Sequence, residues 1–241
     1  MDRYLQQVIV PEIGREGQAK IQSAKVLVVG AGGLGVPLST YLVATGIGIV
    51  GIIDGDVVST SNLHRQFSYS EEHVEQSKAL TLQSSLSAQN ETVQVRAHNE
   101  TLDNANAASL IGQYDIICDC SDNVETRILL DHFCETQNKP LIYAAVKDWE
   151  GYVTVLHHQK KISLNTIFAL DALISNGGMN CSVAGIIGST CGVAASIQAS
   201  EAIKIIVGMK SELDGGILCF DLRLPVFRVF RLNKNISKMR Q

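Results

Sequence analysis

A glycine-rich turn at residues 30–35 (GAGGLG) constrains the fold of this chain more than any other feature. It follows a short apolar run, 25–29 (KVLVV), and precedes an apolar segment that reaches Gly46, which predicts a strand, a tight turn and a helix. Glycines let a backbone turn sharply and approach a phosphate, and the helix N-terminus that follows favours negative charge. The turn therefore predicts a nucleotide site at the carboxyl end of a parallel strand.

The remaining chain alternates between strand-like and helix-like segments. After the strand at 25–29, we expect further strands at 49–53, 93–98, 115–120, 140–146, 152–158, 217–221 and 226–231, and helices at 33–46, 73–88, 103–112, 123–137 and 184–208. This rhythm predicts an α/β, Rossmann-like fold, with a mostly parallel sheet, helices on both faces and C-terminal antiparallel strands. We expect a single domain over 1–241, with an N-terminal helical extension (1–24) and a long crossover loop at about 159–183.

Composition excludes several classes of partner. The formal net charge of -4 argues against a nucleic acid held by bulk electrostatics. We find no uninterrupted apolar run of about 18 residues, so we expect no membrane span. The N-terminus lacks the apolar core of a signal peptide, and none of the 6 cysteines forms a CxxC pair. We therefore expect a cytoplasmic protein with reduced thiols.

An acidic residue follows the second predicted strand. Asp54 ends this strand, where a carboxylate can accept hydrogen bonds from both ribose hydroxyls of an adenosine nucleotide. The glycine turn and Asp54 together predict an adenosine nucleotide and leave open which one it is: NAD, FAD, ATP or a methyl donor. On these two features alone, a nicotinamide enzyme is the first hypothesis.

Further polar residues change that hypothesis. After Asp54 the chain carries Asp56, Asn62, Arg65, Gln66, Lys78 and Asp122, the last of them at the end of another predicted strand. A nicotinamide site has no evident use for these groups, whereas Arg65 and Lys78 can hold a triphosphate and Asp122 can bind Mg²⁺. Asp122 has a second interpretation, since it precedes a predicted helix and can cap it.

The order and spacing of these motifs resemble the ThiF/MoeB/HesA family, the prokaryotic relatives of ubiquitin-activating enzymes. The motifs are GxGGLG, DxD, SNLxRQ, a spaced lysine and CSDN. The resemblance runs from Arg3 to residues 196–204 and implies that the chain is an adenylation domain. It implies ATP-dependent adenylation of the C-terminal glycine carboxylate of a small ubiquitin-fold sulfur carrier ending in Gly-Gly, with release of pyrophosphate. It also implies Mg²⁺ as cofactor and a homodimer.

The resemblance also implies the role of each site residue. Nucleotide contacts are expected from Gly30, Gly32, Gly33, Gly35, Asp54, Asp56, Asn62, Arg65, Gln66 and Lys78. Catalytic roles are expected for Arg65, Lys78, Asp122 and Cys181, with Asp122 also as the metal ligand. Cys181 has two interpretations, a thioester or persulfide nucleophile or an ordinary loop cysteine.

The chain departs from the family pattern at two places that bear on function. Many members carry an arginine that reaches the partner subunit's active site, and Gln6 stands at that position here. A neutral amide does not replace that charge. The alternative function is therefore a weakly active or non-catalytic paralogue that binds nucleotide and carrier as a partner subunit. The second departure is the absence of the two CxxC pairs common in bacterial members, so we expect no zinc.

One histidine pair lies outside all of these motifs. His157 and His158 follow an edge-like strand, and we expect them to start a solvated loop.

Overall fold

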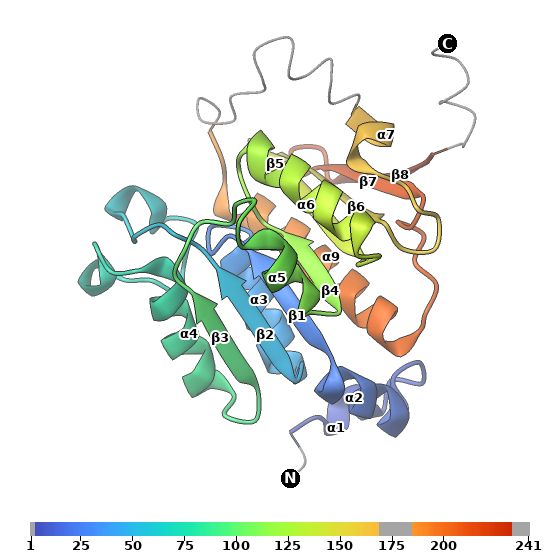
Figure 1. Ribbon diagram of the computed structural model, residues 1–241, viewed down its shortest axis with the longest axis horizontal. Helices are drawn as coiled ribbons and strands as arrows, with labels where there is room; N and C mark the ends of the chain where they lie inside the picture. Colours follow the sequence, from blue (N-terminus) through green and yellow to red (C-terminus); the bar gives the residue numbers. More distant parts are fainter. Residues whose placement is uncertain (1–2, 169–184, 233–241) are drawn as a thin grey trace.

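The computed structural model describes residues 3–168 and 185–232. Within these residues eight strands form one sheet, in the order β3-β2-β1-β4-β5-β6-β7-β8 (Figure 1). Pairing is parallel from β3 to β5 and antiparallel from β5 to β8. The strands are β1 (Lys25–Val29), β2 (Ile49–Ile53), β3 (Gln94–His98), β4 (Ile116–Asp119), β5 (Leu141–Lys147), β6 (Glu150–Leu156), β7 (Gly216–Asp221) and β8 (Val226–Arg231). The predicted Rossmann-like sheet with C-terminal antiparallel strands is confirmed.

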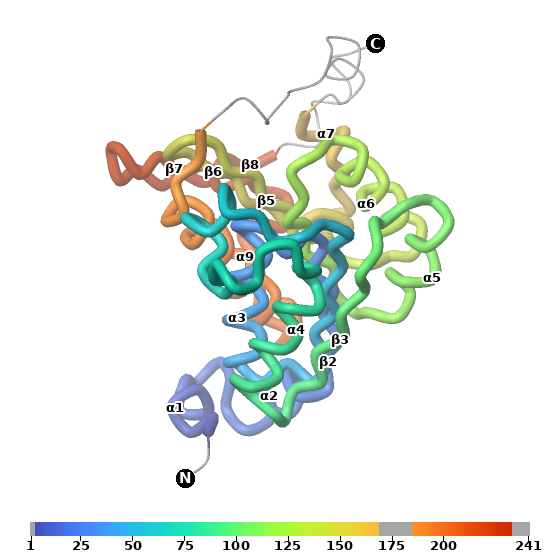
Figure 2. Tube along the Cα trace, turned by 90° about the vertical axis from the view of Figure 1, so that its left-hand side faces the viewer, coloured from blue at the N-terminus to red at the C-terminus, as the bar shows by residue number. Residues whose placement is uncertain are grey.

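Helices cover both faces of the parallel half of the sheet. Their bounds are α1 (Leu5–Val8), α2 (Gly14–Ser23), α3 (Gly35–Thr45), α4 (Lys78–Gln89), α5 (Ala107–Gly112), α6 (Val124–Thr136), α7 (Leu164–Phe168) and α9 (Gly188–Val207). Figure 2 shows α3, α4 and α9 on one face and α5 and α6 on the other. The sandwich of helix, sheet and helix explains why the strands of the parallel half are apolar on both faces.

The central strand β1 shows this double burial most clearly. Val26 and Val28 pack into the cluster beneath α3, α4 and α9, whereas Leu27 and Val29 point to the opposite cluster beneath α5 and α6. All four side chains are buried because successive residues of a strand alternate between its two faces. The apolar run that precedes the glycine turn is thus the central strand of the sheet.

Three predicted helices begin four or five residues later than expected, and one of them is the helix predicted at 103–112, which begins at Ala107. The helix predicted at 73–88 begins at Lys78, because Glu71–His73 forms a separate 3₁₀ turn and Ser77 caps the α-helix by accepting from the Leu80 amide. The helix predicted at 184–208 begins at Gly188. Within the predicted crossover loop, the short helix α7 precedes residues that lie outside the described ones.

Helix α9 is apolar along most of its length. Among the described helices it is the one that is long and apolar enough to cross a membrane, by length and composition alone. In the structure it packs against α2, α3, β5 and β6. Its buried residues include Ala194, Ala195, Ala199 and Ala202, whose small side chains allow close approach to these elements. Burial of α9 against these helices and strands therefore accounts for its apolar character.

The N-terminal helices α1 and α2 lie at the amino ends of the parallel strands, at the opposite end of the sheet from the glycine turn (Figure 1). Gln7 Nε2 donates to the carbonyl of Thr45 at the end of α3 (3.0 Å), and the Gly48 amide donates to Ile21 in α2. Gln6, in contrast, is exposed. Gln6 is therefore remote from the glycine turn of its own chain.

The expectation that His157 starts a solvated loop is wrong. The residue is only 3% exposed, and its Nε2 lies 2.6 Å from Oδ1 of Asp131 in α6. The same carboxylate oxygen accepts from the Leu164 amide at the start of α7. A buried carboxylate on α6 thus anchors the chain that leaves β6, and this partner, distant in sequence, explains the burial of His157.

Candidate active site

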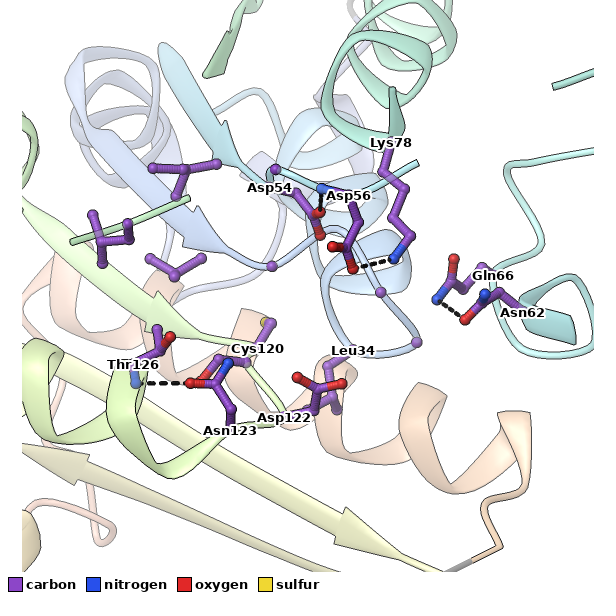
Figure 3. A pocket seen from close by; sticks show the side chains of 18 of the residues that line it. Leu34, Asp54, Asp56, Asn62, Gln66, Lys78, Cys120, Asp122, Asn123 and Thr126 are labelled. Atoms are coloured by element: carbon purple, nitrogen blue, oxygen red, sulfur yellow. Dashed lines mark hydrogen bonds and ion pairs between the residues drawn. The ribbon is translucent and has the colours of Figure 1, made fainter. Parts of the chain in front are cut away.

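A cavity of about 1070 Å³ opens at the carboxyl ends of β1, β2 and β4 (Figure 3). Strand β1 lies between β2 and β4, so the chain connections leave it in opposite directions and open a crevice there. Small-molecule sites usually have volumes of about 300–1,000 Å³, so the cavity has room for a nucleotide and for part of a second substrate.

The cavity brings together most of the residues predicted from the sequence. Its wall contains Gly30, Gly32, Gly33, Asp54, Asp56, Asn62, Arg65, Gln66, Lys78 and Asp122. The predicted nucleophile Cys181 lies outside the described residues. Gly35 is described, and it is absent from the wall.

The glycine turn is constrained by close backbone packing. Gly30 has φ +100°, and a Cβ there would stand 2.7 Å from the Cys120 carbonyl oxygen. A Cβ on Gly35 would collide with the Gly30 carbonyl oxygen. The nucleotide contact of Gly35 stays a prediction, and what the structure shows is that this glycine lets the start of α3 approach the end of β1.

Asp54 is fixed at the carboxyl end of β2 by two backbone groups. Its Oδ2 accepts from the Ala31 amide (2.7 Å) and its Oδ1 from the Asp56 amide (2.8 Å). Burial raises the pKa of Asp54, while these hydrogen bonds and the charge of Lys78 act in the opposite direction. The carboxylate thus ties the glycine turn to β2 and presents its remaining lone pairs to the cavity.

Lys78 projects its ammonium group across the cavity mouth. Its Nζ lies 2.9 Å from Asp56 Oδ2, and the Lys78 side chain is 8% exposed against 77% for Asp56. The Lys78 amide also donates to the Asp56 carbonyl. A buried cation paired with an exposed carboxylate can exchange that partner for a bound anion, because water already solvates the carboxylate.

A second polar group lies beside Gly32 and Gly33 of the glycine turn. Asn62 Oδ1 accepts from Arg65 Nη2 (3.0 Å) and from Gln66 Nε2 (3.2 Å). Gln66 is 2% exposed, and its Oε1 has no hydrogen-bond partner among the described residues. A buried, unsatisfied acceptor in the wall of a cavity indicates a ligand or a bound water that donates to it.

Asp122 points into the cavity from the loop that follows β4 (Figure 3). The alternative that Asp122 caps α6 is wrong, because Asn123 is the N-cap residue and its Oδ1 accepts from the Thr126 amide (2.8 Å). Asp122 is exposed, and no hydrogen bond or ion pair joins its carboxylate to another described residue. The carboxylate is therefore available to a ligand.

Sequence reasoning missed two buried charges beside Asp122, which are Asp119 and Arg127. Arg127 lies in the first turns of α6, is 8% exposed and lines the cavity. A cation near a helix N-terminus opposes the helix dipole, and this was a signal in the sequence that could have indicated a functional role. Asp119 carried no such signal, because it reads as the polar end of an apolar strand.

Cys191 also lines the cavity, near the start of α9. Its Sγ lies against Gly33, and the side chain is 1% exposed. Burial raises the pKa of Cys191 to about 11, with the charge of Arg65 acting in the opposite direction. Cys191 is therefore a protonated packing residue at neutral pH and not an activated nucleophile.

The sequence model of the ThiF family matches residues 4–239. The chain belongs to the ThiF family. Among its relatives is the sulfur carrier protein adenylyltransferase of Thermus thermophilus, 38% identical over 98% of this chain and 88% of that protein. Another is the adenylyltransferase and sulfurtransferase MOCS3 of Caenorhabditis briggsae, 39% identical over 98% of this chain. This ThiF-family chain spans 59% of the length of that MOCS3 protein and about half of several others.

Solved structures share the fold of this chain. Escherichia coli MccB with ATP superposes with a TM-score of 0.82 at 20% identity, covering 97% of this chain and 72% of that chain. PaaA superposes with a TM-score of 0.78 at 21% identity, covering 95% of this chain and 72% of that chain. At this level of identity the likeness establishes the shared fold, and the chemistry of this ThiF-family chain has to be argued from its own cavity.

Proposed function

We propose that this chain transfers AMP from ATP to the C-terminal carboxylate of a small ubiquitin-fold sulfur carrier. The observation that carries the proposal is the cavity itself, which the free carboxylate of Asp122 lines together with the cations Arg65 and Lys78. The named relatives, a sulfur carrier protein adenylyltransferase and MOCS3 adenylyltransferases, support this choice of reaction.

The cavity suggests where ATP binds. The glycine turn at 30–33 leaves space for phosphate beside the start of α3, where backbone N–H groups and the helix dipole favour an anion. Asp54 lies next to the turn and can accept from ribose hydroxyls. Arg65 and Lys78 then neutralise the outer phosphates, with Lys78 leaving Asp56 for the anion.

The residues present also fit a magnesium ion. Mg²⁺ usually binds one or two carboxylates together with substrate phosphates and waters. Asp122 would hold it, because its carboxylate has no described partner, and the orphaned Oε1 of Gln66 can accept from a coordinated water. When bound, Mg²⁺ supplies charge neutralisation on the phosphate oxygens.

The reaction follows from this placement. An oxygen of the carrier's terminal carboxylate attacks the α-phosphorus of ATP and forms a new P–O bond. The bond between the α-phosphorus and the bridging oxygen breaks, and pyrophosphate leaves with its electron pair. The protein need supply no covalent group, since alignment of the two substrates and neutralisation by Arg65 and Lys78 lower the barrier.

The assembly in which this occurs is part of the proposal. We expect the carrier to end in Gly-Gly and the enzyme to act as a homodimer. Helix α1 and the residues after it leave Leu5, Ile9 and Val10 exposed at 49%, 63% and 42%, which supports pairing through this segment. We place the enzyme in the cytoplasm, since each cysteine that the structure describes is a free thiol.

ATP–pyrophosphate exchange tests the proposed function. Purified protein is incubated with ATP, labelled pyrophosphate, Mg²⁺ and a panel of ubiquitin-fold carriers ending in Gly-Gly, including the carrier of the Thermus thermophilus relative. We expect label in ATP only when a carrier is present, and a carrier truncated by its last two glycines serves as control. A protein that binds no ATP and shows no exchange with any carrier would overturn the proposal.

The alternative of a weakly active or non-catalytic subunit makes a separate prediction at Gln6. The described cavity retains both cations and the free carboxylate, and this opposes loss of activity. Because Gln6 is exposed on α1, far from its own cavity, an arginine there would act on a second copy of the chain. A marked gain of exchange in Gln6→Arg would show an intact but weakened site, and no gain would show that the site does not need this cation.

A further inference from the structure

The loop that carries Asp122 is held by buried groups that the proposed reaction does not itself use. Asp119 ends β4 and is completely buried. Its Oδ1 accepts from both the amide and the hydroxyl of Ser121, at 2.9 and 2.6 Å. The residue directly before Asp122 is thus fixed at its N–H group and at its side chain.

Arg127 holds the same residue from the other side. Its Nη2 donates to the Ser121 carbonyl (3.0 Å), and its guanidinium lies over the Tyr143 ring, 5.3 Å from the ring centre. Arg127 and Tyr143 are both nearly buried, so the guanidinium has little freedom to turn away. Every hydrogen-bonding group of Ser121 is therefore engaged by either Asp119 or Arg127.

The strand end beneath this loop is also fixed. Gln198 of α9 donates from Nε2 to the carbonyls of Asp119 (2.9 Å) and Ile142 (3.0 Å). The Cys120 amide donates to Val29, and its carbonyl packs against Gly30. The loop after β4 is thereby joined to the glycine turn that we propose holds the phosphates.

The buried carboxylate of Asp119 is unfavourable for stability on its own. Its Oδ2 has no hydrogen-bond partner among the described residues. Burial raises the pKa of Asp119, and the charge of Arg127 and the bonds from Ser121 only partly oppose this. A buried group that costs stability without full compensation is typical of functional sites.

We propose that Asp119 and Arg127 are positioning residues that clamp Ser121 from both sides and so aim the Asp122 carboxylate into the cavity. The clamp rests on the proposed function, since it acts through Asp122 in adenylation. Asn123 fixes the other flank of Asp122 by capping α6. The Asp122 side chain alone is left free, with its backbone held in place before a substrate binds.

A double-mutant cycle tests the clamp. Asp119→Ala is measured alone and in combination with Asp122→Asn, by pyrophosphate exchange with the carrier that proves active. A misplacement of about 1 Å can cost about 100-fold in rate, so we expect a loss of that order in kcat from Asp119→Ala alone. In the Asp122→Asn background the further loss should stay within about threefold, as expected for residues that act as one unit.

The matched control is Asp115→Ala, at the opposite end of β4. Asp115 also accepts from a backbone amide, that of Lys25 (2.8 Å), but it lies far from the cavity. We expect its kcat to stay at the wild-type value even if its thermal midpoint falls. KM for ATP should change little in Asp119→Ala, which separates positioning from a general loss of the binding site.

Conservative variants keep the test usable if Asp119→Ala folds poorly. Asp119→Asn retains an acceptor for Ser121, and Arg127→Lys retains a charge, so each should recover part of the activity lost in Asp119→Ala and Arg127→Met. An equal loss of kcat from Asp119→Ala in both backgrounds would overturn the clamp, as would wild-type rates in Asp119→Ala and Arg127→Met.

A crystal structure separates failure of the clamp from failure of the proposed function. If the wild-type chain shows no exchange, the proposed function fails while the clamp is still tested by comparing Asp122 in crystals of wild type and Asp119→Ala. We expect the Asp122 carboxylate to be displaced or disordered in the variant. An unmoved Asp122 would overturn the clamp whatever the activity.

Discussion

The two sides of the cavity hold their charged groups in opposite ways. On the β2 side, Lys78 is paired with Asp56, an exposed partner that a bound anion can replace. On the β4 side, buried groups hold the backbone before Asp122, and the Asp122 carboxylate itself is free. The β2 side is therefore built to change partners, whereas the β4 side is already arranged.

This difference separates binding from chemistry. Phosphate binding can accommodate some rearrangement, since an ammonium group attracts an anion from many directions. Alignment of an attacking carboxylate with the α-phosphorus tolerates much less. We therefore expect substitutions on the β2 side to act mainly on ATP affinity and substitutions on the β4 side to act mainly on kcat.

The largest effect is expected from Asp122→Asn. Loss of one preorganised electrostatic group typically lowers kcat by about 100- to 1,000-fold, and we expect a loss in this range with ATP affinity changed far less. Steady-state pyrophosphate exchange gives kcat, and isothermal titration with a non-hydrolysable ATP analogue gives affinity. Asp115→Asn is the control, because Asp115 directly precedes β4 and so lies at the opposite end of this strand from Asp122. An Asp122→Asn enzyme with full kcat would remove the functional contrast between the two sides.

The next largest effect is expected from Lys78→Met. A hydrogen bond to a charged group contributes about 1.5–3 kcal/mol, so we expect ATP affinity to fall by roughly 10- to 100-fold. Lys210→Met is the matched control, because Lys210 also forms an ion pair, 2.6 Å from Glu212, but its side chain is 77% exposed. Unchanged ATP affinity in Lys78→Met, measured by the same titration, would show that Lys78 serves only its pair with Asp56.

How much of this arrangement was predictable differs between the two sides. The β2 side is built from residues that are near one another in sequence or belong to recognisable motifs, so Asp54, Asp56 and Lys78 were found from the sequence as candidate site residues, and all three line the cavity. The mostly parallel sheet with C-terminal antiparallel strands followed in the same way, from the alternation of strand-like and helix-like segments. Sequence motifs were sufficient to find site residues wherever those residues belong to the motifs themselves.

The clamp on the β4 side was not predictable in this way. Its contacts join β4, α6, α9 and β5, and such partners meet only when the chain is folded. The same reason explains His157, which looked like a loop residue until Asp131 of α6 was seen beside it. Gly35 was placed by its motif at the right turn, but its contact with Gly30 depends on backbone geometry that sequence spacing does not specify.

Gly35→Ala tests the backbone packing that joins the two sides. A methyl group there meets the Gly30 carbonyl, so we expect a loss of about 1–3 kcal/mol in the free energy of unfolding, measured by urea denaturation. Gly192→Ala in α9 is the matched control, since a Cβ there meets nothing within 4 Å. That change should stabilise the helix by about 0.5–1 kcal/mol. Equal effects from the two substitutions would show that the turn tolerates a side chain.

The smallest effect concerns the dependence of stability on pH at Asp119. Because burial raises its pKa in the folded state, the folded chain keeps a proton that the unfolded chain has already released. Stability contributed at this residue is therefore highest below the unfolded pKa of about 4 and is lost as pH rises through the folded value. Asp119→Asn has no charge to develop, so its stability relative to wild type should increase with pH.

Urea midpoints of wild type and Asp119→Asn, compared at intervals from pH 4 to pH 8, measure this difference, since the other carboxylates are common to both proteins. A gap between the two that stays constant with pH would mean that Arg127 and Ser121 compensate the buried charge fully. The β4 side would then be held in place without the stability cost that we infer for Asp119. Asp119 would differ from the Lys78–Asp56 pair on the β2 side only in how deeply it is buried.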